Sequence, residues 1–167
     1  RDPLMAHTPQ DETAFIGNYS YDAQVAGEEI GFWPSVVLAQ WADETEWGTS
    51  FQFRVGNNIA GISPGGVLAS YAGISEGIAA YVQTAKLPFY DSVRAAKAYG
   101  PHGQATALGN SPWAESHYGT PHGADLVDII EAHNLTQFDP PTITDLLGEL
   151  LMDHGFAVRF LFRTCLH

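Results

Sequence analysis

The chain has 167 residues, 45% of them apolar and 12% aromatic, which suffices for a buried core and argues against intrinsic disorder. It carries 19 acidic against 7 basic residues, a net charge of −12, so nucleic acids and anionic membrane surfaces are unfavourable partners. It has no run of about 18 apolar residues to cross a membrane, and its single cysteine, Cys165, excludes an internal disulfide. We expect one compact domain with a tail and, within this segment, no signal peptide.

In the first part of the chain, polar residues and two prolines predict a loose lead-in over 1–12. Recurring apolar residues over 13–31 predict one or two short helices, with a break near residues 19–20. A helix over 34–47 follows, since proline suits a first helical turn. The next stretch, 51–66, is rich in Gly, Asn and Ser, which is typical of a loop.

Four further helices, one of them short, are predicted in the middle of the chain. The first, over 75–87, begins at a capping serine and is stopped by proline, and the second covers 90–99. A region rich in Gly, Pro and Ser then holds a short helix at 104–108, before a last helix with a clear apolar face over 124–133. The pattern is mostly helical, with room for at most a small hairpin near 53–71.

Two prolines at 140–141 end this pattern, and a tail over 140–167 follows. Its apolar residues first fall at helical spacing and then alternate, which predicts an amphipathic helix followed by a strand or a buried extended segment. Burial of such side chains is favourable. We therefore expect residues 143–162 to pack back on the domain, to self-associate or to bind a neighbouring domain.

The most informative stretch is LAQWADETEWGTS, residues 38–50, which places Glu44 near the end of an apolar helix and beside two tryptophans. Desolvation penalises an ionised carboxylate, so a carboxyl group in such a setting tends to keep its proton at neutral pH. A protonated carboxylic acid in a cleft is the group that a glycosidase uses to protonate the leaving sugar oxygen. The stretch therefore predicts a general acid, while Glu46 should point elsewhere on the helix.

Four segments form an ordered set of motifs: PSVVLAQ with the Glu44 stretch (34–50), NNIAGIS (57–63), SPWAESHYG (111–119) and DLVDIIEAHNLTQFD (125–139). Together they resemble glycoside hydrolase family 73, the bacterial and phage N-acetylglucosaminidases that hydrolyse peptidoglycan. The resemblance implies a catalytic domain over 13–139. It also implies a lysozyme-like α+β architecture that is mostly α: a helical bundle around a substrate groove, here with a reduced or absent β-lobe.

The resemblance also implies roles for single residues. Glu44 takes the position of the general acid. Tyr118 takes that of a tyrosine beside the reacting sugar, where it stabilises positive charge, orients the acetamido group or packs under the groove. The side chains expected to bind sugar are Gln40, Trp47, Asn57, Asn58, Tyr71 and Trp113. The alternative for Trp47 is a place in the core, and for the two asparagines it is a turn in the αL conformation.

A second carboxylate is harder to find. Many members of the family carry one on the β-lobe, but the corresponding stretch here, SPGGVLASYAG (63–73), contains no acid. A retaining enzyme needs a nucleophile at about 5 Å from the acid, and an inverting enzyme needs a base at about 6.5–9.5 Å. The options are the acetamido group of the substrate, a lone acid with a positioned water, or an acid from elsewhere such as Glu76 or Glu115.

Histidines are the main competing feature. HYGTPH contains His117 and His122, but it lies in a loop rich in Gly and Pro rather than on a helix or strand with ligand spacing. Hydrogen-bonding or surface histidines are the better interpretation. We therefore expect no metal site and no cofactor.

The sequence thus predicts a peptidoglycan hydrolase that cleaves the β-1,4 bond after N-acetylglucosamine. It would be secreted, associated with the cell wall, or encoded by a phage as a lysin or virion component. The enzymatic alternatives are an N-acetylmuramidase and a lytic transglycosylase on the same fold. The non-enzymatic alternative is a glycan-binding or structural module, which the missing second acid would favour.

Overall fold

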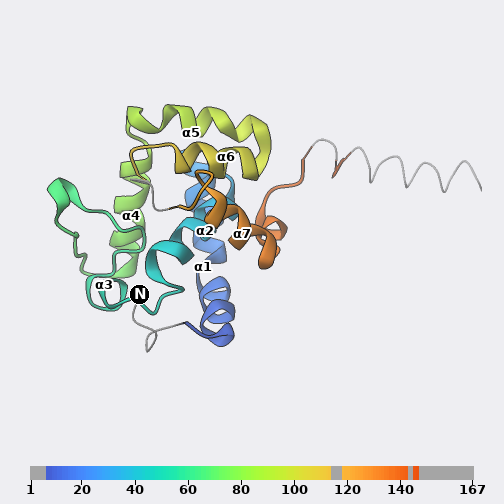
Figure 1. The fold of residues 1–167 in the computed structure, drawn as a ribbon. Helices are drawn as coiled ribbons and strands as arrows, with labels where there is room; N and C mark the ends of the chain where they lie inside the picture. The colour runs from blue at the N-terminus through green and yellow to red at the C-terminus, as the bar shows by residue number, and fades with distance from the viewer. Residues whose placement is uncertain (1–6, 114–117, 143–144, 147–167) are drawn as a thin grey trace, which may run out of the picture.

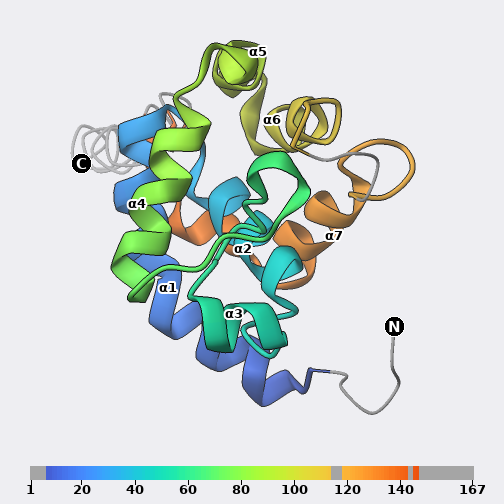
Figure 2. The same ribbon diagram turned by 90° about the vertical axis from the view of Figure 1, so that its left-hand side faces the viewer.

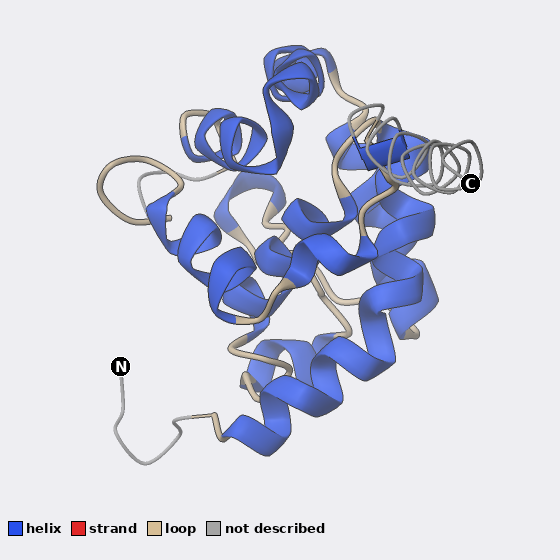
Figure 3. Ribbon diagram, turned by 90° about the vertical axis from the view of Figure 1, so that its right-hand side faces the viewer, coloured by secondary structure: helices blue, strands red, loops and turns tan. Residues whose placement is uncertain are grey.

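The computed structural model describes residues 7–113, 118–142 and 145–146. Within these ranges the chain is built from helices, 3₁₀ turns and loops, and no strand occurs (Figures 1 and 3). In chain order the helices are α1 (Pro9–Ile30), α2 (Pro34–Thr45), α3 (Phe51–Gly56), α4 (Ile74–Ala85), α5 (Asp91–Ala95), α6 (Gly100–Gly109) and α7 (Ala124–Ala132). The predicted mostly helical, lysozyme-like class is confirmed.

Helix α2 lies at the centre of the domain, in contact with α1, α6, α7 and the 3₁₀ turn η5 (Leu135–Phe138) (Figure 2). Ten of its twelve residues are buried, as expected for a helix that is surrounded on every side. The two exceptions, Asp43 and Glu44, are half-buried and lie near its C-terminal end. The helix therefore brings acidic side chains from the core to the surface at one end only.

The other end of α2 is capped from far along the chain. Trp33, the N-cap residue, offers no side-chain hydrogen bond to the backbone of the first turn of α2. Instead the Ser35 backbone N–H donates to Asp139 Oδ1 at 2.8 Å, and the Ser35 hydroxyl donates to Asp139 Oδ2 at 2.7 Å. A carboxylate at a helix N-terminus satisfies backbone donors and interacts favourably with the helix dipole. Burial nevertheless raises the pKa of Asp139, and the two hydrogen bonds from Ser35 oppose that shift.

Asp139→Asn should make the free energy of unfolding less dependent on pH. Because the pKa of Asp139 is higher in the folded than in the unfolded protein, its contribution is fully present below about pH 3.9 and is lost as the pH rises through the folded pKa. An asparagine does not titrate. Urea unfolding followed by circular dichroism should therefore show that the stability of the variant rises relative to that of the wild type between about pH 3 and pH 7.

Asp139→Ala is the matched control, because it removes both hydrogen bonds at every pH. It should cost about 0.5–2 kcal/mol, the usual range for a lost N-cap. A difference between Asp139→Asn and the wild type that stays constant with pH would contradict the prediction.

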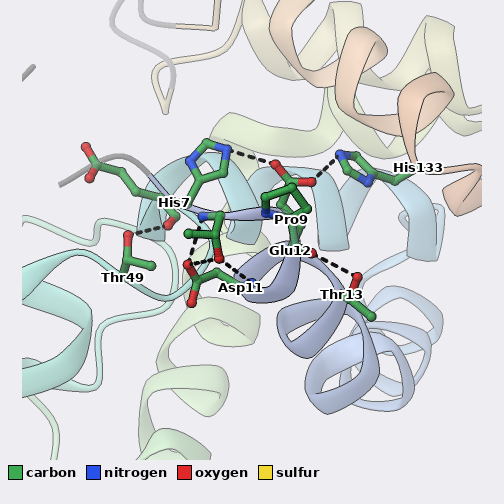
Figure 4. Close-up of polar contacts among 9 residues, drawn as sticks. His7, Pro9, Asp11, Glu12, Thr13, Thr49 and His133 are labelled. Atoms are coloured by element: carbon green, nitrogen blue, oxygen red, sulfur yellow. Dashed lines mark hydrogen bonds and ion pairs between the residues drawn. The ribbon is translucent and has the colours of Figure 1, made fainter. Parts of the chain in front are cut away.

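Helix α1 begins earlier and runs further than the sequence suggested. It starts at Pro9, inside the predicted lead-in, because Thr8 and Asp11 form a capping box (Figure 4). It then continues for 22 residues without the predicted break. Glu12 lies between two imidazoles, 3.0 Å from His7 Nε2 and 3.8 Å from His133 Nε2, and so connects the start of α1 to the end of α7.

Other boundaries also differ from the prediction. Part of the expected loop 51–66 is helix α3, which Ser50 caps by accepting a hydrogen bond from the Phe53 N–H at 3.3 Å. The expected helix 90–99 is divided between α5 and two 3₁₀ turns, Pro88–Tyr90 and Ala96–Tyr99. Helix α6 is longer than the predicted 104–108, whereas α2, α4 and α7 lie close to their predicted ranges.

The segment between α3 and α4 takes the place of a β-lobe. It is a loop with one 3₁₀ turn, Pro64–Gly66. Its two arms are joined by backbone hydrogen bonds from Ala69 N–H to Ile62 O (2.9 Å) and from Tyr71 N–H to Gly56 O (2.8 Å). The sequence left room for at most a small hairpin here, and this fully described segment contains no strand, so the lobe is reduced to a hydrogen-bonded loop.

Apart from 145–146, the predicted amphipathic segment of the tail, 143–162, lies outside the described residues, so its self-association stays a prediction. Across the described helices, none combines the length and apolar character needed to span a membrane.

Candidate active site

Glu44 occupies the point where α2 reaches the surface. Its Oε1 accepts a hydrogen bond from the Tyr118 hydroxyl. Its Oε2 lies against Gly61 of the NNIAGIS motif, so closely that a Cβ at this position would overlap it. Gly61 also has φ +61°, a left-handed conformation that favours glycine. Two motifs that are distant in sequence therefore contact one carboxyl group.

Tyr118 lies beneath this carboxyl, with 1% of its surface exposed. Burial raises the pKa of Tyr118 well above its usual value, and the nearby charge of Glu44 and the hydrogen bond to it add to the effect. The phenol is therefore protonated at neutral pH and acts as a donor to Glu44. Its burial favours the predicted place under the groove over direct contact with sugar.

Gln40 requires a correction, because the sequence placed it among the sugar-binding residues. Its side chain has no exposed surface. Its Nε2 donates to the Tyr118 hydroxyl oxygen at 3.1 Å, and its Oε1 accepts from the Tyr81 hydroxyl at 3.0 Å. Gln40 therefore contacts the buried side of the site, and a bound sugar would not reach it.

Sequence reasoning missed Tyr81. It lies on the apolar face of α4 and packs edge-on against Trp41 with ring centroids 5.3 Å apart. Nothing in the sequence separates it from an ordinary core aromatic. Only the fold shows that its hydroxyl reaches Gln40.

The two asparagines use their side chains to shape the loop. Asn57 ends α3 in the αL conformation (φ 51°), and its Nδ2 donates to Tyr71 O at 3.0 Å. Asn58 is 3% exposed, donates to Ile62 O and Ala69 O at 2.9 and 3.1 Å, and accepts from the Ile62 N–H. The predicted αL turn is thus found at Asn57, whereas Asn58 shapes the loop through its side-chain hydrogen bonds. The predicted sugar contact is wrong for Asn58, which is buried.

Trp47 belongs to the core rather than to a sugar platform. It is 6% exposed and packs edge-on against Phe15, with ring centroids 6.0 Å apart, and against His133 at 4.5 Å. Its backbone follows the end of α2 with φ 58°, and this left-handed step turns the side chain back toward α1 and α7. Of the two alternatives, the core placement is observed.

Trp47→Ala should therefore lower the free energy of unfolding by about 3–5 kcal/mol, the usual cost of removing a large aromatic side chain from a core. At a temperature where the variant is folded, its KM for glycan should stay near the wild-type value. Tyr71→Ala, at a half-exposed position, is the contrasting variant. It should raise KM and leave the free energy of unfolding near the wild-type value. Urea unfolding and steady-state kinetics give both quantities. A raised KM with unchanged stability in Trp47→Ala would restore the platform role.

Two predicted aromatic contacts keep exposed surface near the site. Trp113 is half-buried, and its indole N–H donates to Ala60 O at 3.1 Å, next to Gly61. Its ring also packs in a tilted arrangement against those of Tyr81 and Tyr90, with centroids 5.2 and 5.1 Å away. Tyr71 is half-exposed on the other arm of the same loop. Both stay candidates for sugar contact.

The second carboxylate is not supplied by the candidates that the structure describes. Glu76 is exposed, and its carboxylate lies over Gly73, the N-cap of its own helix α4. Glu115 lies outside the described residues. Asp43, beside Glu44 in sequence, is close enough that its charge contributes to the raised pKa of Tyr118. Among the described residues, no group of three or more His, Cys, Asp or Glu side chains could hold a metal ion.

Residues 20–135 match the sequence family Glucosaminidase, described as mannosyl-glycoprotein endo-β-N-acetylglucosaminidase. The chain belongs to this family. The match covers well over half of the 167 residues and includes Gln40, Glu44 and Tyr118. It confirms the predicted resemblance and the predicted class of enzyme, so this glucosaminidase domain is a glycoside hydrolase.

Two solved structures share the fold of the glucosaminidase domain. The catalytic domain of the autolysin Auto from Listeria monocytogenes is 22% identical, with a TM-score of 0.61, and the match covers 80% of this chain and 90% of that one. N-acetylmuramoyl-L-alanine amidase from Staphylococcus aureus is 19% identical, with a TM-score of 0.66, and the match covers 83% of this chain and 46% of that one. The comparison with curated proteins found no match.

Proposed function

We propose that this domain hydrolyses the β-1,4 bond after N-acetylglucosamine in the glycan strands of peptidoglycan, with Glu44 as the general acid. The observation that carries the proposal is the position of Glu44, which ends a buried helix and has one carboxyl oxygen fixed by a buried phenol. The names of the two structural neighbours, an autolysin and an N-acetylmuramoyl-L-alanine amidase, support the cell wall as the place of action.

The geometry suggests how the acid works. The Tyr118 hydroxyl holds Oε1, so the carboxyl group is fixed with Oε2 on the side of Gly61. A leaving oxygen must come within about 2.6–3.2 Å of the protonated carboxyl oxygen. After transfer, the hydrogen bond from Tyr118 stabilises the carboxylate that remains. The missing side chain at Gly61 keeps room for the carboxyl group.

The second half of the reaction has two routes in this site. Residues 63–73 are all described and contain no acid. We infer that, as the bond to the leaving oxygen breaks, either the substrate's acetamido oxygen or a water near Glu44 bonds to the anomeric carbon. In the first route a water then opens the cyclic intermediate, and in both routes the Glu44 carboxylate takes up the proton that the attacking water loses. Trp113 and Tyr71 flank the loop that faces Glu44 and would contact the sugar rings. The net charge of −12 does not attract the anionic wall, so a separate binding domain or a larger particle would deliver the enzyme.

The test is the chemistry of the new chain end. Purified peptidoglycan is digested, reduced with borohydride and analysed by mass spectrometry. Products that end in reduced N-acetylglucosamine would support the proposal. Reduced N-acetylmuramic acid would indicate a muramidase, and an anhydro end a lytic transglycosylase. No product, together with no clearing in a zymogram, would indicate a glycan-binding or structural module.

A further inference from the structure

We propose that Gln40 is a positioning residue, which together with Tyr81 directs the single hydroxyl proton of Tyr118 toward Glu44. The inference rests on the proposed role of Glu44 as the acid. It concerns how that acid is held in its working state. It also gives a function to a side chain that has no access to substrate.

The geometry is a row of hydrogen bonds that all run in one direction. The Tyr81 hydroxyl donates to Gln40 Oε1 at 3.0 Å, Gln40 Nε2 donates to the Tyr118 oxygen at 3.1 Å, and the Tyr118 hydroxyl donates to Glu44 Oε1. Tyr81 and Gln40 have no exposed surface, and Tyr118 has 1%. Bulk water therefore does not compete for these donors and acceptors, and the direction is set by the side chains alone.

The orientation of the Gln40 amide decides where the Tyr118 proton points. With Nε2 toward Tyr118, the phenol oxygen accepts, and its one proton is directed at Glu44. With the amide reversed, Oε1 would draw that proton away from Glu44, and the Tyr81 hydroxyl would face a donor. A buried hydroxyl proton without an acceptor is costly. Tyr81 therefore fixes the amide, and the amide fixes Tyr118.

The hydrogen bond from Tyr118 serves both the protonated and the ionised state of Glu44. While Glu44 carries the proton to be transferred, the Tyr118 hydroxyl holds Oε1 and so fixes the orientation of the carboxyl group. Once the proton has left, the same hydrogen bond stabilises the carboxylate. No rotation of Tyr118 is needed between the two states. Preorganisation of this kind lowers the barrier because the dipole is already in place.

The test is a double-mutant cycle in kcat. Gln40→Met keeps the length of the side chain and removes the amide, and Tyr118→Phe removes the hydroxyl. Each should lower kcat, Gln40→Met by about five- to tenfold, the value of one neutral hydrogen bond. KM should be unchanged, because Gln40 does not reach the sugar. In the Tyr118→Phe background, Gln40→Met should have almost no further effect on kcat.

The matched control is Gln104, a second glutamine with no exposed surface. It accepts from the Trp33 N–H and donates to Gly31 O and Val93 O, all backbone groups away from Glu44. Gln104→Met should lower the melting temperature, leave kcat unchanged while the protein is folded, and show no coupling to Tyr118→Phe. A general loss of packing would affect the two glutamines alike.

The pH profile gives a second readout. If Gln40 acts through Tyr118, both Gln40→Met and Tyr118→Phe weaken stabilisation of the ionised acid, so the alkaline limb of kcat should move to higher pH in both. The proposal would be overturned if the effects of Gln40→Met and Tyr118→Phe on kcat were independent and additive and the alkaline limb of the pH profile did not move in either variant. The proposed function would then still stand, because it is tested separately, by the chemistry of the new chain end and by the loss of activity in Glu44→Gln.

Discussion

Glu44→Gln should reduce glycan cleavage by at least about 100-fold, within the range of about 10²–10⁴ that general acid catalysis contributes. The amide keeps the shape of the side chain and can still accept the Tyr118 hydroxyl through its oxygen. It cannot deliver a proton to the leaving sugar. The melting temperature should therefore stay close to the wild-type value while release of reducing ends falls.

Glu46→Gln is the control for this experiment. Glu46 follows α2 as its C-cap in the left-handed conformation (φ 50°), only two residues from Glu44. It should retain wild-type activity, because the turn of the chain directs it away from the Tyr118 hydroxyl. Retained activity in Glu44→Gln, together with its loss in Glu46→Gln, would mean that the wrong carboxylate has been chosen.

Gly61→Ala should lower kcat by roughly 100-fold, since a misplacement of about 1 Å at a reacting group can cost that much. The new Cβ would overlap Glu44 Oε2, and the carboxyl group would have to swing away. Moving the end of a flexible side chain costs little stability. The alanine itself is strained by the left-handed backbone, by about 1–2 kcal/mol. Activity should therefore fall far more than stability does.

Gly65→Ala separates the effect of backbone strain from the effect of displacing Glu44, because Gly65 has nearly the same φ as Gly61. Gly65 has φ +64° against +61° for Gly61, but an added Cβ there meets nothing within 4 Å. The two variants should lose similar stability in urea unfolding, and Gly65→Ala should keep its kcat. An equal loss of kcat in both would attribute the effect to strain in the loop rather than to the acid.

The motifs predicted the correct class of enzyme, but not the contacts between motifs. Gln40 and Glu44 are four residues apart, so the sequence places them on one face of a helix. It cannot show that Tyr118, 78 residues after Gln40, covers the space between them and excludes sugar. The sugar contact predicted for Gln40 is therefore replaced by a buried hydrogen bond that only tertiary packing creates.

Local backbone conformation explains other differences. Glu46 and Trp47, directly after α2, both have positive φ, and this turn places the Trp47 side chain in the core. Sequence patterns do not report the sign of φ. Helix α3 was not predicted because its stretch is rich in Gly and Asn. Ser50 before an apolar run is nevertheless a capping signal that could have indicated it. The reverse holds for α1, where no proline or glycine at 19–20 justified a break.

The cap on α2 has a consequence for how the enzyme becomes active. Asp139 closes the helix that carries Glu44 from 104 residues away, and Tyr118 meets Glu44 across 74 residues. Contacts between such distant residues form late, because the chain between them must first be ordered. In a nascent chain, Glu44 would thus lack the Tyr118 hydrogen bond until almost the whole domain had been synthesised. Glycan cleavage by this domain should therefore be a stringent reporter of complete folding.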